Sequence, residues 1–280
     1  MMGAGKRVEK GAGGFKMKLK LLSQSKEKMS FLLEGVDISF ANALRRCAIE
    51  EVPVMAIDTI EFRKNFSALY DEIIAHRLGF VVLSTDLKSY NLPEECKCKG
   101  AGCQSCQLKL VLMADAKKDR YVYASEIESK DPKVKPFYPN TIIVKLLKGQ
   151  KLELEATAVL GKGKNHVKWS PGLVHYKYKP VIEIIKMPKD PESVAKMCPQ
   201  GIFEVKNKKL EINKDKILNC HLCGACEEAS EGAVKLNENS QDLVFYVESW
   251  GQLKPKEIMI QAATEFSQKL EDFEKAIMKK

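Results

Sequence analysis

The sequence contains no long apolar run, and its 280 residues include only two tryptophans and four histidines. A helix that crosses a bilayer needs about 20 consecutive apolar residues, so no membrane span is expected. The first residues also lack the apolar segment of a secretory signal peptide, which predicts a protein that stays in the cytoplasm. Hydrophobic residues make up 45% and charged residues 30%, a balance typical of globular proteins.

Several signatures of enzymatic chemistry are also missing. Nucleotidyl transfer needs clustered carboxylates for magnesium, and the chain has no D-x-D motif. It has no G-x-x-x-x-G-K-S/T phosphate loop, no G-x-S-x-G turn and no G-x-G-x-x-G motif. His76, His166, His175 and His221 stand apart from any candidate nucleophile, which favours structural roles. We therefore predict that this chain holds no catalytic residues.

The chain carries a modest basic surplus, 46 − 37 = +9. Because the basic residues are spread along the sequence, a solvated lysine-rich surface explains this surplus better than a nucleic-acid site. A zinc-containing nucleic-acid binder would also need a concentrated basic face with aromatic stacking residues. Only Trp169, Trp250 and scattered tyrosines are available for that role.

Cysteine is the one residue type that is clearly clustered. Eight of the nine cysteines fall into two groups, while Cys47 stands alone on the apolar face of a predicted helix and is expected to pack in the core. Thiols stay reduced in the cytosol, so clustered cysteines there indicate metal binding in preference to disulfides.

The first group consists of Cys96, Cys98, Cys103 and Cys106. Four thiolates in so short a loop, with the spacing C-x-C-x4-C-x2-C, can close around one tetrahedral ion at little cost in loop entropy. Gly100 and Gly102 allow the tight backbone that such a loop needs. Zinc in a closed structural site fits best, and the alternative is four free cysteines.

The second group consists of Cys198, Cys220, Cys223 and Cys226. Its last three members have the C-x2-C-x2-C spacing of bacterial ferredoxins. Ferredoxins with two clusters have two such runs, and each run has a fourth cysteine, followed by proline, that binds the cluster of the other run. Here Cys198 is followed by Pro199, whereas Ser230 and Glu231 stand where the run's own Cys-Pro would be. The pattern predicts one iron–sulfur cluster, 4Fe–4S or, with a labile iron, 3Fe–4S, with zinc as the runner-up.

Hydrophobic periodicity predicts an α+β fold with two or three compact units. Residues 1–14 contain five glycines and are expected to form a mobile tail. Alternation over 15–33 predicts a β-hairpin whose first strand is half-buried through Met17, Leu19 and Leu21. A helix over 37–51 follows, with Phe40, Leu44, Cys47 and Ala48 on its apolar face, and ends at Pro53.

The rest of the chain alternates between strands and short helices. After a strand at 54–63, an insertion at 64–187 is predicted to hold a helix and mainly β structure. Within it, the helix covers 69–78 and the extended stretches cover 108–114, 141–147, 151–159 and 173–187. Residues 188–236 form a small ferredoxin-like unit that begins with a helix at Asp190-Pro191.

A strand at 243–248 and a long helix at 255–278 complete the chain. The helix carries one apolar stripe, formed by Ile258, Ala262, Phe266, Leu270, Phe273 and Ile277. A stripe of this length needs a surface to cover it, which is either another chain or the protein's own domain.

Four ordered blocks of this sequence resemble the alpha-like subunit family of DNA-directed RNA polymerases, in its archaeal, D-type form. They are FANALRRCAIEEVPVMAIDTIEF (40–62), LYDEIIAHRLGFVVL (69–83), VKWSPGLVHYKYKP (167–180) and FYVESWGQLKPKEIMIQAATEF (245–266). The resemblance covers nearly the whole chain beyond the tail. It implies a non-catalytic assembly subunit, because the nucleotidyltransferase chemistry of this family lies in the large subunits.

The resemblance further implies a split dimerisation domain, formed by 15–63 and 237–280, with an insertion domain (64–187) and a ferredoxin-like domain (188–236) between its halves. The helix at 37–51 and the C-terminal helix would pack against the small subunit L. This heterodimer, with small subunits N and P, would be the platform for the large subunits. Arg45 and Arg46 match family positions that contact a large subunit, and DNA would be met only through the complex.

The second cysteine group, considered by itself, also fits a different class of function. A ferredoxin-class electron-transfer protein would need a cluster near the surface and a redox partner. The ferredoxin-like segment is only a small part of the chain, and no flavin or nicotinamide fingerprint accompanies it. A structural role, in which the cluster orders a domain too small to build a large core, explains the same residues.

Overall fold

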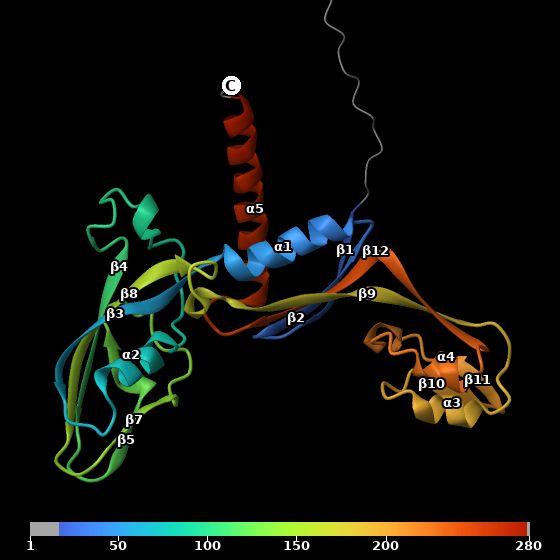
Figure 1. Ribbon diagram of the computed structural model, residues 1–280, viewed down its shortest axis with the longest axis horizontal. Helices are drawn as coiled ribbons and strands as arrows, with labels where there is room; N and C mark the ends of the chain where they lie inside the picture. The colour runs from blue at the N-terminus through green and yellow to red at the C-terminus, as the bar shows by residue number, and fades with distance from the viewer. Residues whose placement is uncertain (1–16, 279–280) are drawn as a thin grey trace, which may run out of the picture. The chain divides into compact units, whose positions relative to one another are not determined.

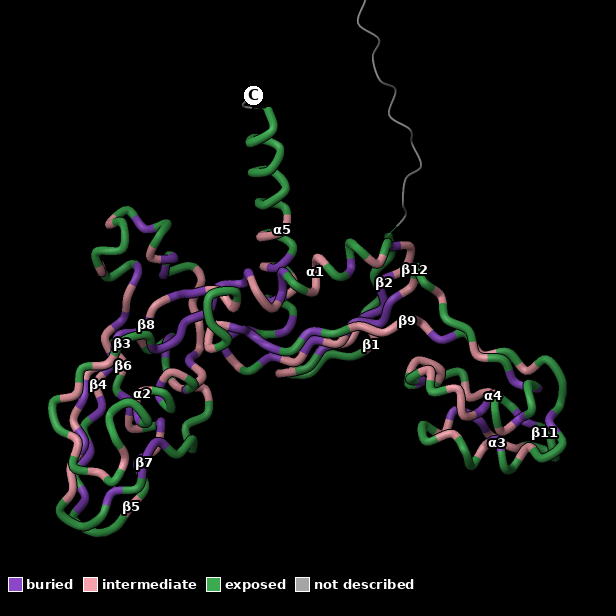
Figure 2. Tube along the Cα trace, viewed as in Figure 1, coloured by how far each residue is buried: buried purple, intermediate pink, exposed green. Residues whose placement is uncertain are grey.

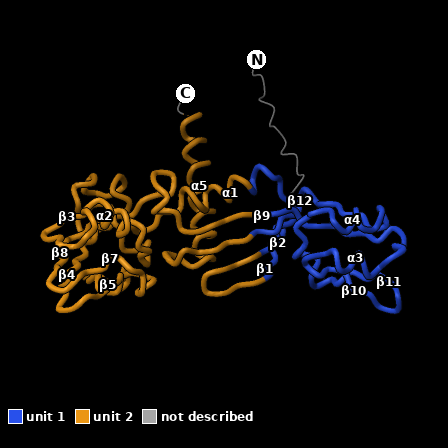
Figure 3. Tube along the Cα trace, turned by 60° about the horizontal axis from the view of Figure 1, so that its bottom comes forward, with its two compact units in different colours: residues 1–22, 31–41, 176–245 blue, residues 23–30, 42–175, 246–280 orange. Residues whose placement is uncertain are grey.

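The computed structural model describes residues 17–278, so the predicted tail at 1–14 lies outside the described residues. The chain divides into two compact units (Figure 3). One contains residues up to 22, 31–41 and 176–245, and the other contains residues 23–30, 42–175 and 246–280. Within residues 17–278, no helix is long and apolar enough to cross a membrane.

A four-stranded sheet has the order β1-β2-β12-β9 (Figure 1). Its strands are β1 (Lys18–Gln24), β2 (Lys28–Glu34), β9 (Gly172–Ile184) and β12 (Val234–Ser249). Phe245 of β12 is fully buried and stacks on Phe31 of β2 at a centroid distance of 5.1 Å. Tyr176 of β9 lies against the same ring at 5.2 Å. These aromatic contacts between neighbouring strands form the centre of the sheet's core.

The predicted hairpin is confirmed, but the predicted half-burial of its first strand is wrong. Met29, Phe31 and Leu33 of β2 are buried as expected. Met17, Leu19 and Leu21 are instead 54%, 65% and 50% exposed. The physical reason is that β1 is the edge strand of the sheet and no other described element covers its apolar side chains.

The ferredoxin-like segment forms a small body with its own core. Its elements are α3 (Pro191–Met197), β10 (Phe203–Lys206), β11 (Lys209–Ile212), the 3-10 turn η4 (Ile217–Asn219) and α4 (Ala225–Ala229). Asp190 begins α3 by accepting hydrogen bonds from the N–H groups of Glu192 and Ser193, which confirms the predicted helix start. Its buried core consists of Val194, Ile202, Phe203, Leu210, Cys220, Cys226 and Val234.

A second antiparallel sheet has the order β3-β8-β4-β6. Its strands are β3 (Pro53–Asn65), β4 (Gln107–Asp115), β6 (Ile127–Ser129) and β8 (Lys151–Lys162). The helix α2 (Asp71–Gly79) packs on it, and a separate pair, β5 (Arg120–Tyr123) with β7 (Ile142–Leu146), completes this body. Short 3-10 turns occur at η1 (Pro93–Glu95), η2 (Ala124–Glu126) and η3 (Val167–Trp169).

The strands pair across both predicted boundaries of the insertion at 64–187. β3 pairs with β8 along nearly its whole length, from Pro53 opposite Lys162 to Asn65 opposite Leu152. Residues 53–63 therefore share a sheet with the insertion, although the sequence interpretation assigned them to the dimerisation domain. β9, which was assigned to the insertion, neighbours β12 in the other sheet.

The two helices of the predicted dimerisation domain are α1 (Ile38–Glu50) and α5 (Pro255–Met278). Asp37 begins α1 by accepting the Ser39 N–H at 2.7 Å. The apolar face predicted for α1 is only partly buried. Cys47 and Ala48 are buried, whereas Leu44 is half-buried and Phe40 is 38% exposed.

An ion-pair network holds α5 up to Lys269. Glu51, 7% exposed, accepts a hydrogen bond from Lys269 of α5. Lys162 of β8 lies 3.8 Å from Glu51 and donates to Glu265 of α5 at 3.0 Å. Burial raises the pKa of Glu51, but the hydrogen bond and charge of Lys269, with the charge of Lys162, outweigh it and leave the pKa below its ordinary value.

We predict that Glu51→Gln destabilises this unit by about 1–3 kcal/mol, because charge-assisted bonds are lost where little water can replace them. The pKa of Glu51 is lower in the folded state than in the unfolded state. Its contribution to the free energy of unfolding is therefore complete above the unfolded-state pKa of about 4.5 and is lost as the pH falls through the folded-state pKa. Denaturant unfolding at several pH values measures this difference. The matched control is Glu50→Gln, because Glu50 pairs with Arg46 at the surface. This substitution is expected to lower the free energy of unfolding by at most about 1 kcal/mol. Equal costs for the two variants, or a difference independent of pH, would contradict the assignment.

Candidate metal centres and partner surface

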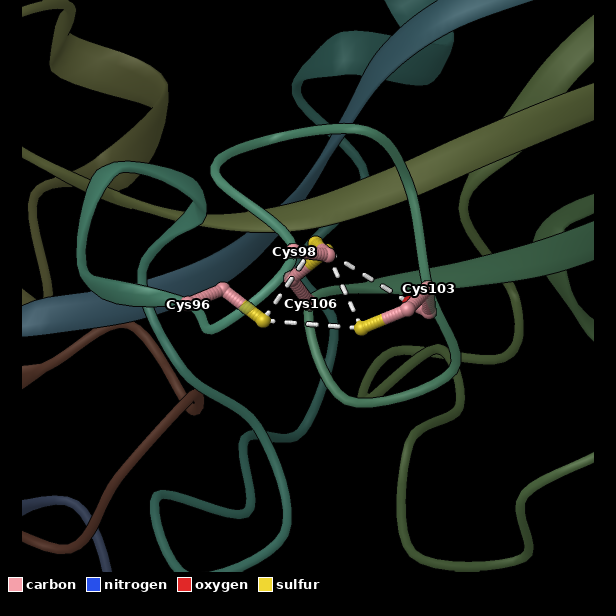
Figure 4. A group of neighbouring side chains, drawn as sticks. All are labelled: Cys96, Cys98, Cys103 and Cys106. Carbon is pink, nitrogen blue, oxygen red and sulfur yellow. Dashed lines mark hydrogen bonds between the residues drawn. The ribbon is translucent and has the colours of Figure 1, made fainter.

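The first cysteine group is assembled as predicted (Figure 4). Cys96 follows η1, Cys98 and Cys103 lie in the loop after it, and Cys106 immediately precedes β4. All four sulfur atoms lie within 4.8 Å of one another, and it is the only group of potential ligands this compact among the residues the structure describes.

The sulfur spacing suits a single tetrahedral ion. A tetrahedron with Zn–S bonds of about 2.3 Å has sulfur atoms about 3.8 Å apart. The Sγ atom of Cys96 lies 3.5 Å from that of Cys103 and 3.4 Å from that of Cys98. The Sγ atom of Cys106 lies 3.5 Å from that of Cys98 and 3.8 Å from that of Cys103. These residues therefore fit a zinc ion with four thiolate ligands and no open position.

The loop backbone turns through left-handed conformations to bring the sulfurs together. Lys99, Gly100 and Gly102 have φ values of 53°, 81° and 88°. Glycine adopts such values without strain, which is why two of them occur in this short loop. A side chain at position 102 would also collide with Gln107, whose Nε2 donates to the Gly102 carbonyl oxygen at 2.6 Å.

The pKa values of Cys98 and Cys106 are shifted in opposite directions. The backbone N–H of Cys103, followed by the thiols of Cys96 and Cys106, stabilises the Cys98 thiolate and lowers the pKa of Cys98 to about 5. Burial, followed by the neighbouring sulfurs of Cys98 and Cys103, raises the pKa of Cys106 to about 12. Bringing all four to the thiolate form therefore requires a cation, since four adjacent negative charges repel one another.

The second cysteine group is also brought together, but more widely spaced. Cys198 caps α3, Cys220 follows η4, and Cys223 and Cys226 flank the start of α4. All four line one pocket. Their sulfurs do not gather at the single-ion distances of the first group.

The surroundings of this pocket are mainly apolar. Ile182, Ile202, Phe203 and Leu236 share its lining with the cysteines. Burial raises the pKa of both Cys220 and Cys226. Lys177 of β9 donates to the Cys220 carbonyl oxygen at 2.9 Å. The sequence interpretation missed Lys177, because nothing local in the sequence links a strand lysine to a cysteine so far along the chain.

The predicted partner-interface residues divide into two sets. Ile258 and Ala262 of α5 are fully buried within the chain and anchor the helix. Phe266 is half-buried, whereas Leu270 is 54% and Phe273 66% exposed. Every described residue of α5 from 267 onward is exposed (Figure 2). The apolar stripe is therefore covered by the chain's own domain over its first half only.

On α1, the side chains predicted to meet a large subunit keep local partners. Arg45 donates to the Asn42 side-chain oxygen at 3.0 Å, and Arg46 pairs with Glu50 at 3.1 Å. These exposed interactions contribute little stability and are easily exchanged for contacts with another chain.

The histidines have ring or loop contacts that fit structural roles. His76 meets Phe80 edge-on at 5.1 Å, and His175 stacks on Tyr246 at 5.0 Å. His166 accepts a hydrogen bond from the Lys168 N–H at 3.1 Å. His221 lines the pocket of the second cysteine group.

Comparison with known proteins identifies a family. The model of the RNA polymerase Rpb3/Rpb11 dimerisation domain matches residues 30–270. The DNA-directed RNA polymerase subunit Rpo3 of Methanosarcina mazei is 38% identical over 259 residues, which cover 91% of this chain and 96% of that protein. The same subunit of Pyrococcus horikoshii is 38% identical over 87% of this chain and 91% of that protein. The same subunit of Methanosphaera stadtmanae is 34% identical over 91% of this chain and 97% of that protein.

We predict that Cys98→Ser removes the metal held by the first group, because a closed tetrahedral site with three thiolates and a weak hydroxyl ligand binds zinc far less tightly. Zinc content, measured by atomic spectroscopy after purification, is expected to fall by about one equivalent per chain. Cys47→Ala, which changes a buried cysteine outside both groups, serves as the control and leaves the metal content unchanged. Unaltered zinc in the Cys98 variant would show that this group is not the zinc site.

Proposed function

Because the chain belongs to the Rpb3/Rpo3 family of DNA-directed RNA polymerase subunits, we propose that it is the cytoplasmic assembly subunit that pairs with the small alpha-like subunit L. As a member of this family it is a non-catalytic part of the polymerase. The pair, together with small subunits N and P, forms the platform on which the large subunits assemble, and the chain meets DNA only through that complex.

The observation that carries this proposal is the uncovered half of α5. Leu270 and Phe273 present large apolar side chains to solvent, on a helix whose first half is fixed by Ile258 and Ala262. Exposed apolar surface of this kind marks an interaction site. The proposed interface combines these residues with Phe266 of α5 and with Phe40 and Leu44 of α1. Arg45 and Arg46 are proposed to contact a large subunit.

We further propose that the second cysteine group holds one iron–sulfur cluster, 4Fe–4S or 3Fe–4S, on Cys198, Cys220, Cys223 and Cys226. Two features support a cluster over a single zinc ion, namely the C-x2-C-x2-C spacing of the cysteines along the sequence and the mainly apolar pocket that they line. When bound, the cluster supplies covalent cross-links through iron between segments far apart in the chain. Zinc is proposed for the first group.

The role of the cluster in this proposal is structural. The four cysteines join the end of α3, the loop after η4 and the start of α4, which otherwise share only a small core. The matches reported above are to polymerase subunits and give no support to the ferredoxin-class electron-transfer alternative.

Analysis of iron, acid-labile sulfide and zinc in the anaerobically purified protein tests the metal assignment. The proposal expects iron and sulfide in cluster proportions together with about one zinc per chain. Zinc in both sites, with no sulfide, would overturn the cluster assignment and leave the subunit assignment untouched.

We predict that Phe273→Asp weakens association with the small alpha-like subunit by at least about thirty-fold, which corresponds to about 2 kcal/mol for an aromatic hot-spot residue. Isothermal titration with the purified partner measures this loss. Gln268→Asp introduces the same charge on the opposite side of the exposed helix and is expected to change the affinity little. Circular dichroism checks that both variants keep their helices. Equal affinity of the two variants would contradict the proposed interface.

We predict that Cys220→Ser destabilises residues 188–236 but leaves the heterodimer intact, because the interface lies on α1 and α5. Limited proteolysis is expected to cut within 188–236 several-fold faster in the variant. A pull-down with the small subunit should recover the same amount of complex. Loss of the heterodimer in this variant would count against a purely local role for the cluster.

A further inference from the structure

A surface pocket of about 300 Å³ lies in the unit that contains the second sheet. It is lined by β3, by residues 79–82 at the end of α2, by η3 and the residue after it, and by the connection between β12 and α5. All of these segments belong to one compact unit. Neither cysteine group contributes to the pocket, and the proposed interface on α1 and α5 does not include it.

The side chains around this pocket are mainly apolar, and several of them are unusually exposed. Phe80, Val167 and Trp250 are 46%, 64% and 41% exposed. Met55 of β3, which also lines the pocket, is fully buried. Large apolar side chains around a concave surface are typical of the centre of a binding interface.

One lining residue has an unsatisfied polar atom. Gln252 is only 6% exposed, and its Oε1 atom has no hydrogen-bond partner among the described residues. Its Nε2 atom donates to the Ser170 carbonyl oxygen at 3.2 Å. Turning the amide over would place Oε1 against that carbonyl, which is also an acceptor, so the other orientation is worse. A buried acceptor without a donor costs stability, and a group that inserts into the pocket can supply the donor.

The turn that carries Trp250 and Gln252 is fixed before any ligand arrives. Gly251 between them has a φ of 116°, which favours glycine. Its N–H donates to the Ser249 hydroxyl oxygen at 2.9 Å, and the Gln252 carbonyl accepts the Thr85 N–H at 2.9 Å. A ligand would therefore meet an acceptor that is already positioned, which lowers the entropic cost of binding.

The charges at the pocket favour a neutral ligand. Lys168 is the basic residue among the described side chains that line it. Its ammonium pairs with Asp58 at 2.8 Å and lies 4.3 Å from the centroid of the Trp169 ring. This positive charge repels a lysine or arginine tip. Because it is already paired, it also offers little to the phosphates of a nucleic acid.

We propose that this pocket binds a tyrosine or tryptophan side chain of another polymerase subunit. Phe80, Val167 and Trp250 cover its ring, and its O–H or N–H donates to Gln252 Oε1. These two residue types combine an apolar ring with a neutral donor at its edge. Water is a poorer occupant, because it needs two to four polar partners and the walls are mainly apolar. The assignment of the partner to the polymerase rests on the proposed function, whereas the chemistry of the pocket does not.

Titration of the full chain with small probes tests this chemistry. The chain has two tryptophans, so its two indole N–H resonances are readily followed. We expect p-cresol to shift the Trp250 resonance more than that of Trp169, and to bind about ten-fold more tightly than toluene, which lacks the donor. In Gln252→Leu the two probes should bind equally. Equal binding to the unaltered chain, or tighter binding of butylammonium or uridine than of p-cresol, would overturn the proposal.

Reconstitution of the polymerase from purified subunits tests the partner. Val167→Asp places a charge at the exposed rim, and Leu147→Asp does so at a 47% exposed position that does not line the pocket. Both variants should still pair with the small alpha-like subunit. We expect several-fold less of the Val167 variant than of the control in the assembled polymerase. Equal incorporation would overturn the proposal, whereas failure of the unaltered chain to assemble would overturn the proposed function itself.

Discussion

The attachment of α5 through its first half is the constraint on which the account of this subunit depends. Glu51 lies between Lys269 and Lys162, and Ile258 and Ala262 are fully buried. These interactions fix where the helix starts and in which direction it runs. They end at Lys269, and every described residue that follows it is exposed. A 24-residue helix held in this way leaves the rest of its apolar stripe exposed.

The two cysteine groups lie in segments that are stabilised little by hydrophobic burial. Each lies where the surrounding chain builds little core of its own, in a loop before β4 and in a body with only a few buried side chains. Under the proposed function, metal–thiolate bonds supply there the free energy that hydrophobic burial supplies in the sheets. The spacing of the sulfurs separates the two cases. The sulfurs of the first group all lie within 4.8 Å of one another, whereas the cysteines of the second group line a mainly apolar pocket.

Local sequence patterns predicted most elements of the fold. The helix at 255–278, the hairpin ending in β2 and the helix start at Asp190 all have short-range signals, and all are confirmed. The convergence of Cys96, Cys98, Cys103 and Cys106 was equally predictable, since the four residues lie close together in the sequence. The match to the family model agrees with the resemblance of the four blocks.

What the sequence could not reveal depends on long-range packing. Alternation in β1 predicted a buried face, but burial depends on which element lies above a strand, and no described element covers Leu19 or Leu21. The pairing of β3 with β8 joins residues about a hundred positions apart, so no local signal in the sequence indicated it. For the same reason, the stripe on α5 did not show that Ile258 and Ala262 are covered while Leu270 and Phe273 are not.

Hydrogen exchange over residues 267–278 measures whether the second half of α5 is stable without a partner. In the chain alone, these backbone amides are expected to exchange fast, because every described residue in this stretch is exposed. In complex with the small alpha-like subunit they should exchange at least ten-fold more slowly, while residues 255–265 change little. Strong protection of 267–278 in the monomer, or no added protection in the complex, would contradict the account.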